Sequence, residues 1–231
     1  MPTKFSPLLS VVIPTYNEST RVSEIISQVK KSQYVKEIIV VNDGSTDNSR
    51  RLLAKISGIT LINHVKNLGK AAALKTGLEN THREFIAFVD ADLTGFKTYH
   101  LNKLANKFFE GNNDLVLGHR THDVIWMDWI GFNLAYTGER VIKKRILHLH
   151  PEIFSQPKYL IEPAMNTVFF AKYNVASVSL NGVGQVNKIW KKGLSGLMED
   201  IKMIVSYPQF LGLINFINQL KFAKQLAEHE S

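Results

Sequence analysis

Short apolar runs alternate with stretches of helical periodicity over residues 8–89. The runs read LLSVVIP, EIIVV, ITLI and FIAFV, and the last of them is a short continuous apolar run that suits a strand buried on both faces of a parallel sheet. Between the runs, apolar residues recur at the spacing of an amphipathic helix, at Val22, Ile25, Ile26 and Val29, at Leu52, Leu53 and Ile56, and at Ala71, Leu74 and Leu78. The order βαβαβαβ predicts an α/β fold with a mostly parallel sheet, right-handed crossovers and flanking helices.

Polar segments follow each of the four predicted strands. They are residues 14–18, residues 42–45, residues 64–70, and Asp90 with Asp92. The carboxyl ends of parallel strands meet at one edge of a sheet, where ligands of open α/β folds bind. The sequence therefore predicts that four separate segments line one binding crevice.

Asp90 and Asp92 are the most informative residues of that crevice, because they end a buried strand one residue apart. Short acidic side chains also cap helices and line solvated turns, which is the structural alternative. Two carboxylates that face a diphosphate repel it unless a divalent cation lies between them. Mg²⁺ or Mn²⁺, bound by Asp90 and Asp92, would take oxygen ligands of this kind and neutralise a departing diphosphate.

Two further segments suit phosphate or nucleoside. Residues 67–70 open the third predicted helix, whose free backbone N–H groups attract anions, and Lys70 adds a positive charge there. The alternative for Lys70 is an ordinary surface lysine in a first helical turn. Asp43 follows a strand and can accept hydrogen bonds from a base or a ribose, although the stretch DGSTD also suits a turn and a helix cap.

Composition narrows the class of protein. The chain has 231 residues and no cysteine, which favours one domain with a short appendage and a reducing compartment. The apolar stretch near Met1 is too short for a signal peptide or a spanning helix, so we expect a cytoplasmic location. The net charge is +8, and residues 139–192 hold nine Lys or Arg against three Glu. This excess suits an acidic or lipid-linked partner, or it is a solvated basic face. No nucleic-acid-binding motif accompanies it.

The C-terminal stretch YPQFLGLINFINQLKFAKQLAE is rich in large apolar residues but too short and too polar to span a bilayer. One helical stripe holds Phe210, Leu213, Ile214, Ile217 and Leu220, widened by Phe216 and Phe222. The functional interpretation is a helix that rests on a membrane, helped by Lys191, Lys192, Lys202, Lys221 and Lys224. The alternatives are a helix packed against its own domain or in a homodimer.

The segments SVVIPTYNE, IIVVNDGSTDNS, NLGKAAALKTGL and FVDADL together resemble the nucleotide-sugar half of family-2 glycosyltransferases of the GT-A fold, a group that includes polyprenyl-phosphate sugar transferases. The resemblance covers residues 1–120 and implies a nucleoside-diphosphate sugar, of UDP or GDP type, as donor. The roles that it implies are base and ribose binding by Pro14, Tyr16, Glu18 and Asp43, diphosphate binding by Lys70, and metal binding by Asp90 and Asp92, with Asp92 also catalytic.

The second half carries weaker resemblances. GHR at 118–120 is similar to a G-S-R segment, which implies substrate binding by Arg120, although His119 replaces the usual small residue. TGERVIKKRIL and YLIEPAMN resemble a pattern shared with glucosyl-3-phosphoglycerate synthases. That pattern implies that Glu162 is catalytic, as a general base or as a carboxylate that positions the acceptor. The alternative is a helix-start glutamate, since Pro163 follows. NGVGQVNK lacks the metal-binding histidine of those synthases and offers only Gln185 or Asn187.

We therefore expect a GT-A domain over residues 1–196, with a nucleotide-sugar half (1–120) and an acceptor half (121–196), followed by a helical tail (197–231). The expected reaction is metal-dependent transfer of a sugar to a polyprenyl phosphate, a saccharide or a small phosphorylated molecule. One rival is a haloacid-dehalogenase-like phosphatase with Asp90 as nucleophile, but three predicted strands precede this motif. A second rival is a degenerate protein that binds nucleotide without turnover. A sugar nucleotidyltransferase is disfavoured because PTYNEST has no glycine. Base, sugar, acceptor and stereochemical outcome stay open.

Overall fold

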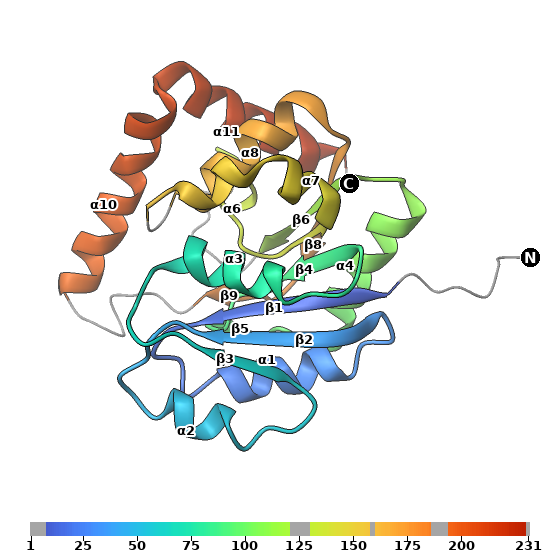
Figure 1. Cartoon of the computed structure of the whole chain (residues 1–231). Coiled ribbons are helices and arrows are strands. Elements are labelled where there is room, and N and C mark those ends of the chain that lie inside the picture. Colours follow the sequence, from blue (N-terminus) through green and yellow to red (C-terminus); the bar gives the residue numbers. More distant parts are fainter. Residues whose placement is uncertain (1–7, 121–129, 158–159, 186–193, 230–231) are drawn as a thin grey trace, which may run out of the picture.

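A seven-stranded sheet forms the centre of the protein (Figure 1), in a computed structural model that describes residues 8–120, 130–157, 160–185 and 194–229. The strand order is β3-β2-β1-β4-β7-β6-β8. The strands are β1 (Leu9–Thr15), β2 (Val35–Asn42), β3 (Thr60–Asn63), β4 (Phe85–Phe88), β6 (Leu115–Arg120), β7 (Arg140–Lys143) and β8 (Val175–Leu180). All neighbours run parallel except β7, which is antiparallel to both β4 and β6. The predicted α/β class with a mostly parallel sheet is confirmed.

Helices connect the strands in the predicted order β1-α1-β2-α2-β3-α3-β4. The helices are α1 (Val22–Lys30), α2 (Ser49–Leu53), α3 (Lys70–Glu79), α4 (Thr98–Glu110), α6 (Phe132–Ala135), α7 (Lys144–Leu149), α8 (Ile161–Lys172), α10 (Leu194–Leu211) and α11 (Leu213–Glu228), with a 3₁₀ turn η1 (Pro151–Ser155). The second helix is shorter than its apolar pattern predicts, since it ends at Leu53 and Ile56 lies beyond it, partly buried against the core.

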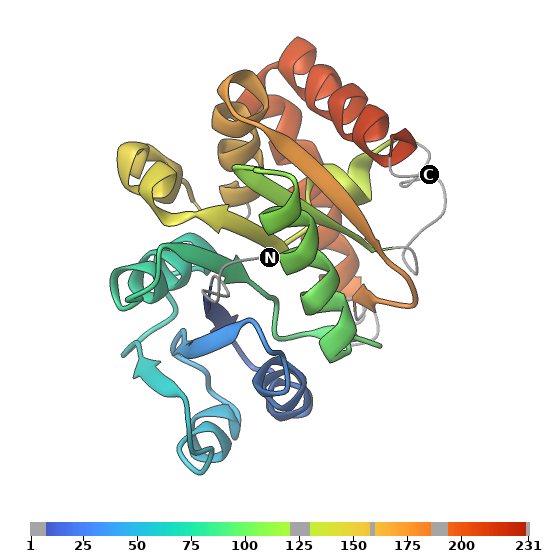
Figure 2. The same ribbon diagram turned by 90° about the vertical axis from the view of Figure 1, so that its right-hand side faces the viewer.

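Two apolar clusters cover the two faces of the sheet. Side chains alternate along β1, so that Val12 joins one cluster while Val11 and Ile13 join the other. Helices α3, α8 and α11 contribute to the first cluster, and α1 and α4 contribute to the second. Figure 2 shows α1 and α3 on opposite sides of β1 and β2. Burial on both faces explains why these strands are continuous apolar runs rather than alternating patterns.

A second, two-stranded sheet lies beyond the carboxyl end of β4. It pairs β5 (Leu93–Thr94) with β9 (Gly184–Gln185) in antiparallel register, with Leu93 opposite Gln185. The pairing links the segment that follows Asp92 to a segment far along the chain. It therefore places Gln185 beside the acidic motif.

The predicted C-terminal helices are present as α10 and α11, joined at Gly212 with φ of +74°. Their inner faces belong to the first apolar cluster, to which Tyr207 and Ala223 contribute. Their outer faces carry exposed apolar side chains. None of the helices in the described ranges is both long and apolar enough to cross a membrane. Lys191, Lys192 and Asn187, which the sequence analysis considered, lie outside the described residues.

Candidate active site

Asp43 links the end of β2 to the loop that precedes α3. Its buried carboxylate accepts hydrogen bonds from the backbone N–H groups of Leu68 (2.9 Å) and Gly69 (2.8 Å), and lies 2.7 Å from Nδ1 of His64. Gly69 has φ of +95°, a conformation that glycine adopts readily. These contacts fix the backbone immediately before Lys70, the first residue of α3. Asp43 thus lies in the expected crevice, with hydrogen bonds to the protein itself.

A second turn brings the loop after β1 against the loop after β2. Asn17 adopts a positive φ of 56°, and its Oδ1 accepts hydrogen bonds from the backbone N–H groups of Thr46 (2.8 Å) and Asp47 (3.3 Å). The backbone N–H of Asn17 donates to Ser45 Oγ at 3.0 Å. These contacts leave the neighbouring Tyr16 side chain 41% exposed, so its ring is accessible for stacking against a flat ligand.

Pro14 and Glu18 flank that turn, and both are partly buried. The backbone N–H of Glu18 donates to Ser49 Oγ at 3.2 Å, which ties the end of this loop to the start of α2. The residues that the sequence analysis assigned to base and ribose therefore lie on adjoining loops after β1 and β2.

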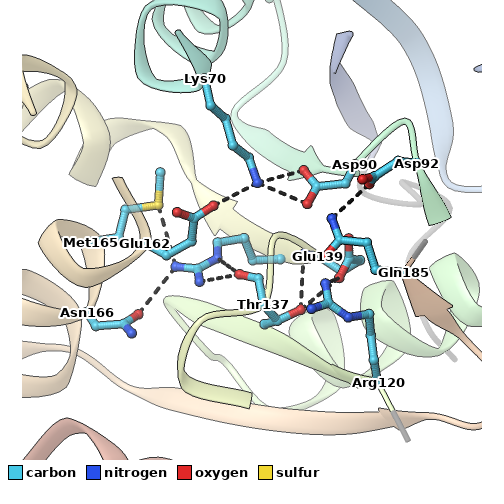
Figure 3. A network of polar contacts seen from close by, with 11 residues as sticks. Lys70, Asp90, Asp92, Arg120, Thr137, Glu139, Glu162, Met165, Asn166 and Gln185 are labelled. Atoms are coloured by element: carbon cyan, nitrogen blue, oxygen red, sulfur yellow. Dashed lines mark hydrogen bonds and ion pairs between the residues drawn. The ribbon is translucent and has the colours of Figure 1, made fainter. Parts of the chain in front are cut away.

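Lys70 bridges two carboxylates from distant parts of the chain (Figure 3). Its Nζ lies 2.7 Å from Oδ1 of Asp90 and 2.7 Å from Oε1 of Glu162. Asp90 follows β4, and Glu162 lies in the first turn of α8, where Pro163 is tolerated because its missing N–H needs no intrahelical partner. One ammonium group therefore joins the predicted donor side to the predicted acceptor side.

The contacts of this bridge determine the ionisation states of Lys70 and Asp90. Burial alone would lower the pKa of Lys70, but Asp90 and Glu162 outweigh that effect and hold the pKa well above its ordinary value. Burial alone would raise the pKa of Asp90, yet the nearby Lys70, with smaller contributions from Arg120 and Arg140, holds it below the ordinary value. Both groups are therefore ionised at neutral pH.

A second layer of buried charge lies behind the bridge. Arg120 donates to Oε2 of Glu139 at 2.9 Å, and the Thr137 hydroxyl donates to the same oxygen at 2.8 Å. Burial raises the pKa of Glu139, which Arg120 only partly offsets. Arg120 was expected to bind substrate; here it is buried and paired with Glu139, at the rear of the crevice.

Arg140 connects helix α8 to this group of buried charged residues. Its guanidinium is fully buried and donates to the backbone oxygen of Thr137 and to Oδ1 of Asn166, the latter at 3.3 Å. Asn166 in turn donates from Nδ2 to the backbone oxygen of Ala135. Burial lowers the pKa of Arg140, while the charges of Glu162 and Glu139 oppose that shift. The network thus fixes α8, and with it Glu162, against the sheet.

Gly138 leaves room for the Asp90 carboxylate. A Cβ atom at this position would lie 2.2 Å from Oδ2 of Asp90 and 2.6 Å from its Cγ, closer than van der Waals contact permits. Only glycine therefore fits here without moving Asp90.

We expect Gly138→Ala to lower turnover by up to about 100-fold, because a shift of about 1 Å in a reacting group can cost that much. The substitution should leave the fold intact, since the added methyl meets a side chain rather than the backbone. The check is turnover of the variant together with its thermal unfolding. Wild-type turnover in a folded variant would show that the position of Asp90 is unimportant.

Asp92 is partly buried and lies two positions after the buried Asp90. Its Oδ1 accepts a hydrogen bond from Nε2 of Gln185 at 2.8 Å. Among the described residues, no group of three or more His, Cys, Asp or Glu side chains is arranged to hold a metal. Asp90 and Asp92 supply two carboxylates, a donor set that fits Mg²⁺ or Mn²⁺ when phosphate oxygens and water complete the shell.

Several residues of the site escaped the sequence analysis: Thr137, Gly138, Glu139, Arg140 and Asn166. They fall in the segments TGER and EPAMN, which had been noted only as resemblances. The available signal was the charged pair Glu139 and Arg140, which stands at the start of a strand in an otherwise apolar sheet. Their shared function as a buried layer depends on the antiparallel strand β7, which the early βα pattern does not predict.

The mostly parallel seven-stranded sheet, with turn loops and an acidic motif after its strands, is the arrangement of a GT-A-type fold. The family model "Glycosyl transferase family 2" matches residues 10–151, more than half of the chain. The chain belongs to glycosyl transferase family 2. The family resemblance that the sequence segments suggested is therefore confirmed.

Curated relatives match this domain only over part of their length. A dolichyl-phosphate beta-glucosyltransferase from Trichomonas vaginalis is 37% identical over 107 residues, which is 39% of this chain and 32% of the relative. A 4,4'-diaponeurosporenoate glycosyltransferase from Staphylococcus aureus is 33% identical over 105 residues, or 43% of this chain and 28% of the relative. The matches thus span about a third of the curated relatives' length.

Solved structures share the fold at low sequence identity. Glucosyl-3-phosphoglycerate synthase from Mycobacterium tuberculosis, crystallised with Mn²⁺ and UDP-glucose, superposes with a TM-score of 0.66 at 20% identity, covering 90% of this chain and 84% of that one. S. aureus TarS superposes with a TM-score of 0.60 at 17% identity, covering 75% of this chain and 58% of that one. These similarities confirm the GT-A fold.

Proposed function

We propose that this protein transfers a sugar from a nucleoside-diphosphate sugar to an acceptor, with the help of a divalent cation. The observation that supports this most is the Lys70 bridge, which lies 2.7 Å from both Asp90 and Glu162. A phosphatase would need Asp90 exposed as a nucleophile, whereas here it is buried and paired with Lys70. A cation beside a strand-end acidic pair suits a diphosphate leaving group better.

On this proposal the donor lies along the loops after β1 and β2. Tyr16, with Pro14 and Glu18 beside it, holds the base. Asp43 contacts the ribose or the base and also positions the loop before Lys70. Lys70 binds the diphosphate from the start of α3. Support for a UDP-type donor comes from the neighbour crystallised with UDP-glucose.

Asp90 and Asp92 are the proposed ligands of Mg²⁺ or Mn²⁺, which when bound neutralises negative charge on the leaving diphosphate. Gln185 orients Asp92 through its amide hydrogen bond. Arg120 is paired with Glu139, and we propose that it affects the substrate only through Asp90, whose carboxylate it helps to keep ionised. Neighbours crystallised with Mn²⁺ or Mg²⁺ support the choice of metal.

Glu162 pairs with Lys70 from helix α8, opposite Asp90, and we propose that it receives the acceptor, as a base for a hydroxyl or as a positioning carboxylate. The division into a donor half (1–120), an acceptor half (121–196) and a helical tail is part of this proposal. Two curated relatives are named for dolichyl phosphate and for 4,4'-diaponeurosporenoate. These names, with the basic charge of residues 139–192, support a lipid-linked or acidic acceptor.

The test is release of nucleoside diphosphate from a panel of UDP- and GDP-sugars, with Mn²⁺ and again with a chelator. We expect metal-dependent release from one donor, which increases when a lipid-linked or phosphorylated acceptor is added. Release of inorganic phosphate from simple phosphomonoesters, without any release from the sugar nucleotides, would favour the phosphatase instead.

A further inference from the structure

The loop that connects β3 to α3, residues 64–69, leads directly into Lys70 but buries little apolar surface. Residues 65–68 are all exposed; Val65 is fully exposed, and Leu68 is 53% exposed. A loop whose side chains face solvent gains little from burial, so a fixed backbone there requires hydrogen bonds. The hydrogen bonds that hold this loop come from the loop after β2.

Asp43 is the centre of these contacts. Its carboxylate accepts from the backbone N–H groups of Leu68 at 2.9 Å and Gly69 at 2.8 Å. At the next residue, Gly44, the two loops meet backbone to backbone, since an added Cβ would lie 2.4 Å from the carbonyl carbon of Lys66. One carboxylate thus holds two consecutive N–H groups, so the backbone that enters α3 depends on the orientation of Asp43.

His64 supplies a further contact to this carboxylate. Its Nδ1 lies 2.7 Å from Oδ1 of Asp43, and its Nε2 lies 3.0 Å from the hydroxyl of Thr76 on α3. The side chains of His64 and Asp43 are only 9% and 5% exposed. A carboxylate only accepts hydrogen bonds, so Nδ1 carries a proton; the Thr76 hydroxyl both donates and accepts, so it suits Nε2 in either protonation state.

The backbone of His64 is fixed as well, and this fixes the origin of its side chain. Its N–H donates to the carbonyl oxygen of Asn42 at 2.9 Å, which extends the pairing of β2 with the edge strand β3 by one residue. Asn42 also donates from Nδ2 to Oδ1 of Asn63 at 2.8 Å. The His64 ring therefore connects three elements: the end of β3, the carboxylate after β2, and the middle of α3.

A second pair of carboxylate and histidine in the chain provides a comparison. Nδ1 of His82 lies 2.5 Å from Oε1 of Glu37 on β2, but the His82 side chain is 82% exposed. In contrast, His64 is buried, has a partner at each ring nitrogen, and acts on a carboxylate that holds the backbone before Lys70. These differences distinguish the His64 pair from an ordinary surface contact.

We propose that His64 is a positioning residue of the donor site. It holds the Asp43 carboxylate, which holds the backbone of residues 68–69 and so presents Lys70 to the diphosphate; His64 itself needs no contact with the donor. The consequence for the diphosphate rests on the proposed function, whereas the anchoring of the loop does not. Because the effect passes through Lys70, loss of His64 weakens binding of the diphosphate more than binding of the nucleoside.

Two NMR measurements on His64→Ala test the proposal. The first is amide hydrogen exchange at Leu68 and Gly69, which should become at least about tenfold faster, the low end of what a hydrogen bond to a charged group contributes. The second is titration with uridine and with UDP in the presence of Mg²⁺, with guanosine and GDP in parallel. For the nucleoside diphosphate that the wild type prefers, the dissociation constant should rise about tenfold. For its nucleoside it should rise less than about threefold, because the Asp43 carboxylate remains.

Three further variants separate positioning from a general loss of structure. His64→Asn places an amide nitrogen near the position of Nδ1, so it should bind the diphosphate within about threefold of the wild type. Thr76→Val removes only the contact to Nε2 and should weaken diphosphate binding about threefold, which keeps the test valid if His64→Ala does not fold. His82→Ala is the matched control, and both its exchange at residues 68–69 and its nucleotide binding should equal those of the wild type.

Unchanged exchange at Leu68 and Gly69 in His64→Ala would overturn the anchoring, and unchanged diphosphate binding would overturn the positioning role. Equal weakening of nucleoside and diphosphate would also contradict it, because the effect would then act on the nucleoside rather than through Lys70. If neither UDP nor GDP binds to the wild type while both amides lose protection in the variant, the proposed function fails and the anchoring stands.

Discussion

Replacing Asp92 with alanine is expected to lower sugar transfer by about a hundred- to a thousandfold, the scale of loss when one group that stabilises developing charge is removed. Asp92 is partly buried and lies two positions after the buried Asp90. Its Oδ1 accepts a hydrogen bond from Nε2 of Gln185 at this partly buried position, so stability should change little. The measurement is turnover with the preferred donor at saturating Mn²⁺.

Asp92→Asn is the matched control for shape. It keeps an oxygen that can accept from Gln185 but removes the negative charge, and we expect it to lose nearly as much activity as the alanine variant. Thermal unfolding of both variants without ligand should lie within about 2 °C of the wild type, as is usual for substitutions near the surface. Full activity in the folded Asp92→Ala variant would refute the metal-binding role.

Lys70→Met is expected to destabilise the protein by about 3 kcal/mol, because it leaves Asp90 and Glu162 buried without their cation. This is the low end of the range for buried ion pairs, since the Lys70 side chain is 28% exposed. For a chain of this size the unfolding temperature should fall by roughly 6 to 12 °C. Lys75→Met, on the same helix but pairing with Glu79 only at 4.0 Å, should change stability by less than about 0.5 kcal/mol.

The pH dependence of the Lys70→Met effect has a definite sign. In the wild type, Lys70 lowers the pKa of Asp90. The ion pair between them therefore stabilises the fold above the unfolded pKa of about 4, and this stabilisation is lost as pH falls. In the variant, burial of Asp90 without the ammonium of Lys70 favours a higher pKa for that carboxyl, so the folded state is favoured at low pH and loses stability as pH rises. The difference in free energy of unfolding between the wild type and Lys70→Met should therefore be small near pH 4 and largest near pH 7.

The variant Glu162→Gln separates the contribution of the Lys70 ion pairs to stability from the contribution of Glu162 to turnover. Lys70 keeps Asp90 as a partner in this variant, so stability should fall less than in Lys70→Met. Turnover should still fall if Glu162 receives the acceptor. Equal loss of stability in the two variants, with turnover unchanged in Glu162→Gln, would reduce the bridge to a structural contact.

The sequence predicted the first half of the molecule because local pattern and tertiary position agree there. The runs at β1, β2 and β4 are largely buried on both faces, whereas the edge strand β3 is only partly buried, and all four are followed by polar loop residues at the same edge, as parallel topology requires. Asp90 and Lys70 were predicted to lie in one crevice, and they are 2.7 Å apart.

The second half was less accessible to sequence reasoning. Strand β7 begins with Arg140, which is fully buried, so its first residue looks polar although the strand lies between β4 and β6 in the sheet. Its guanidinium donates hydrogen bonds to distant groups such as Oδ1 of Asn166, and sequence spacing alone cannot reveal such partners. The same applies to Gly138, whose necessity arises from the approach of Asp90 across the sheet.

The most direct test of the account is thermal unfolding of the wild type with UDP, GDP, dTDP and CDP, each with Mn²⁺ and again with a chelator. A ligand at 100 times its dissociation constant adds about 2.7 kcal/mol of stability, which corresponds to a shift of roughly 5 to 10 °C for a chain of this size. The account predicts such a shift with one nucleoside diphosphate, dependent on Mn²⁺ and lost in Asp92→Ala. No shift with any nucleotide, or an equal shift in Asp92→Ala, would contradict it.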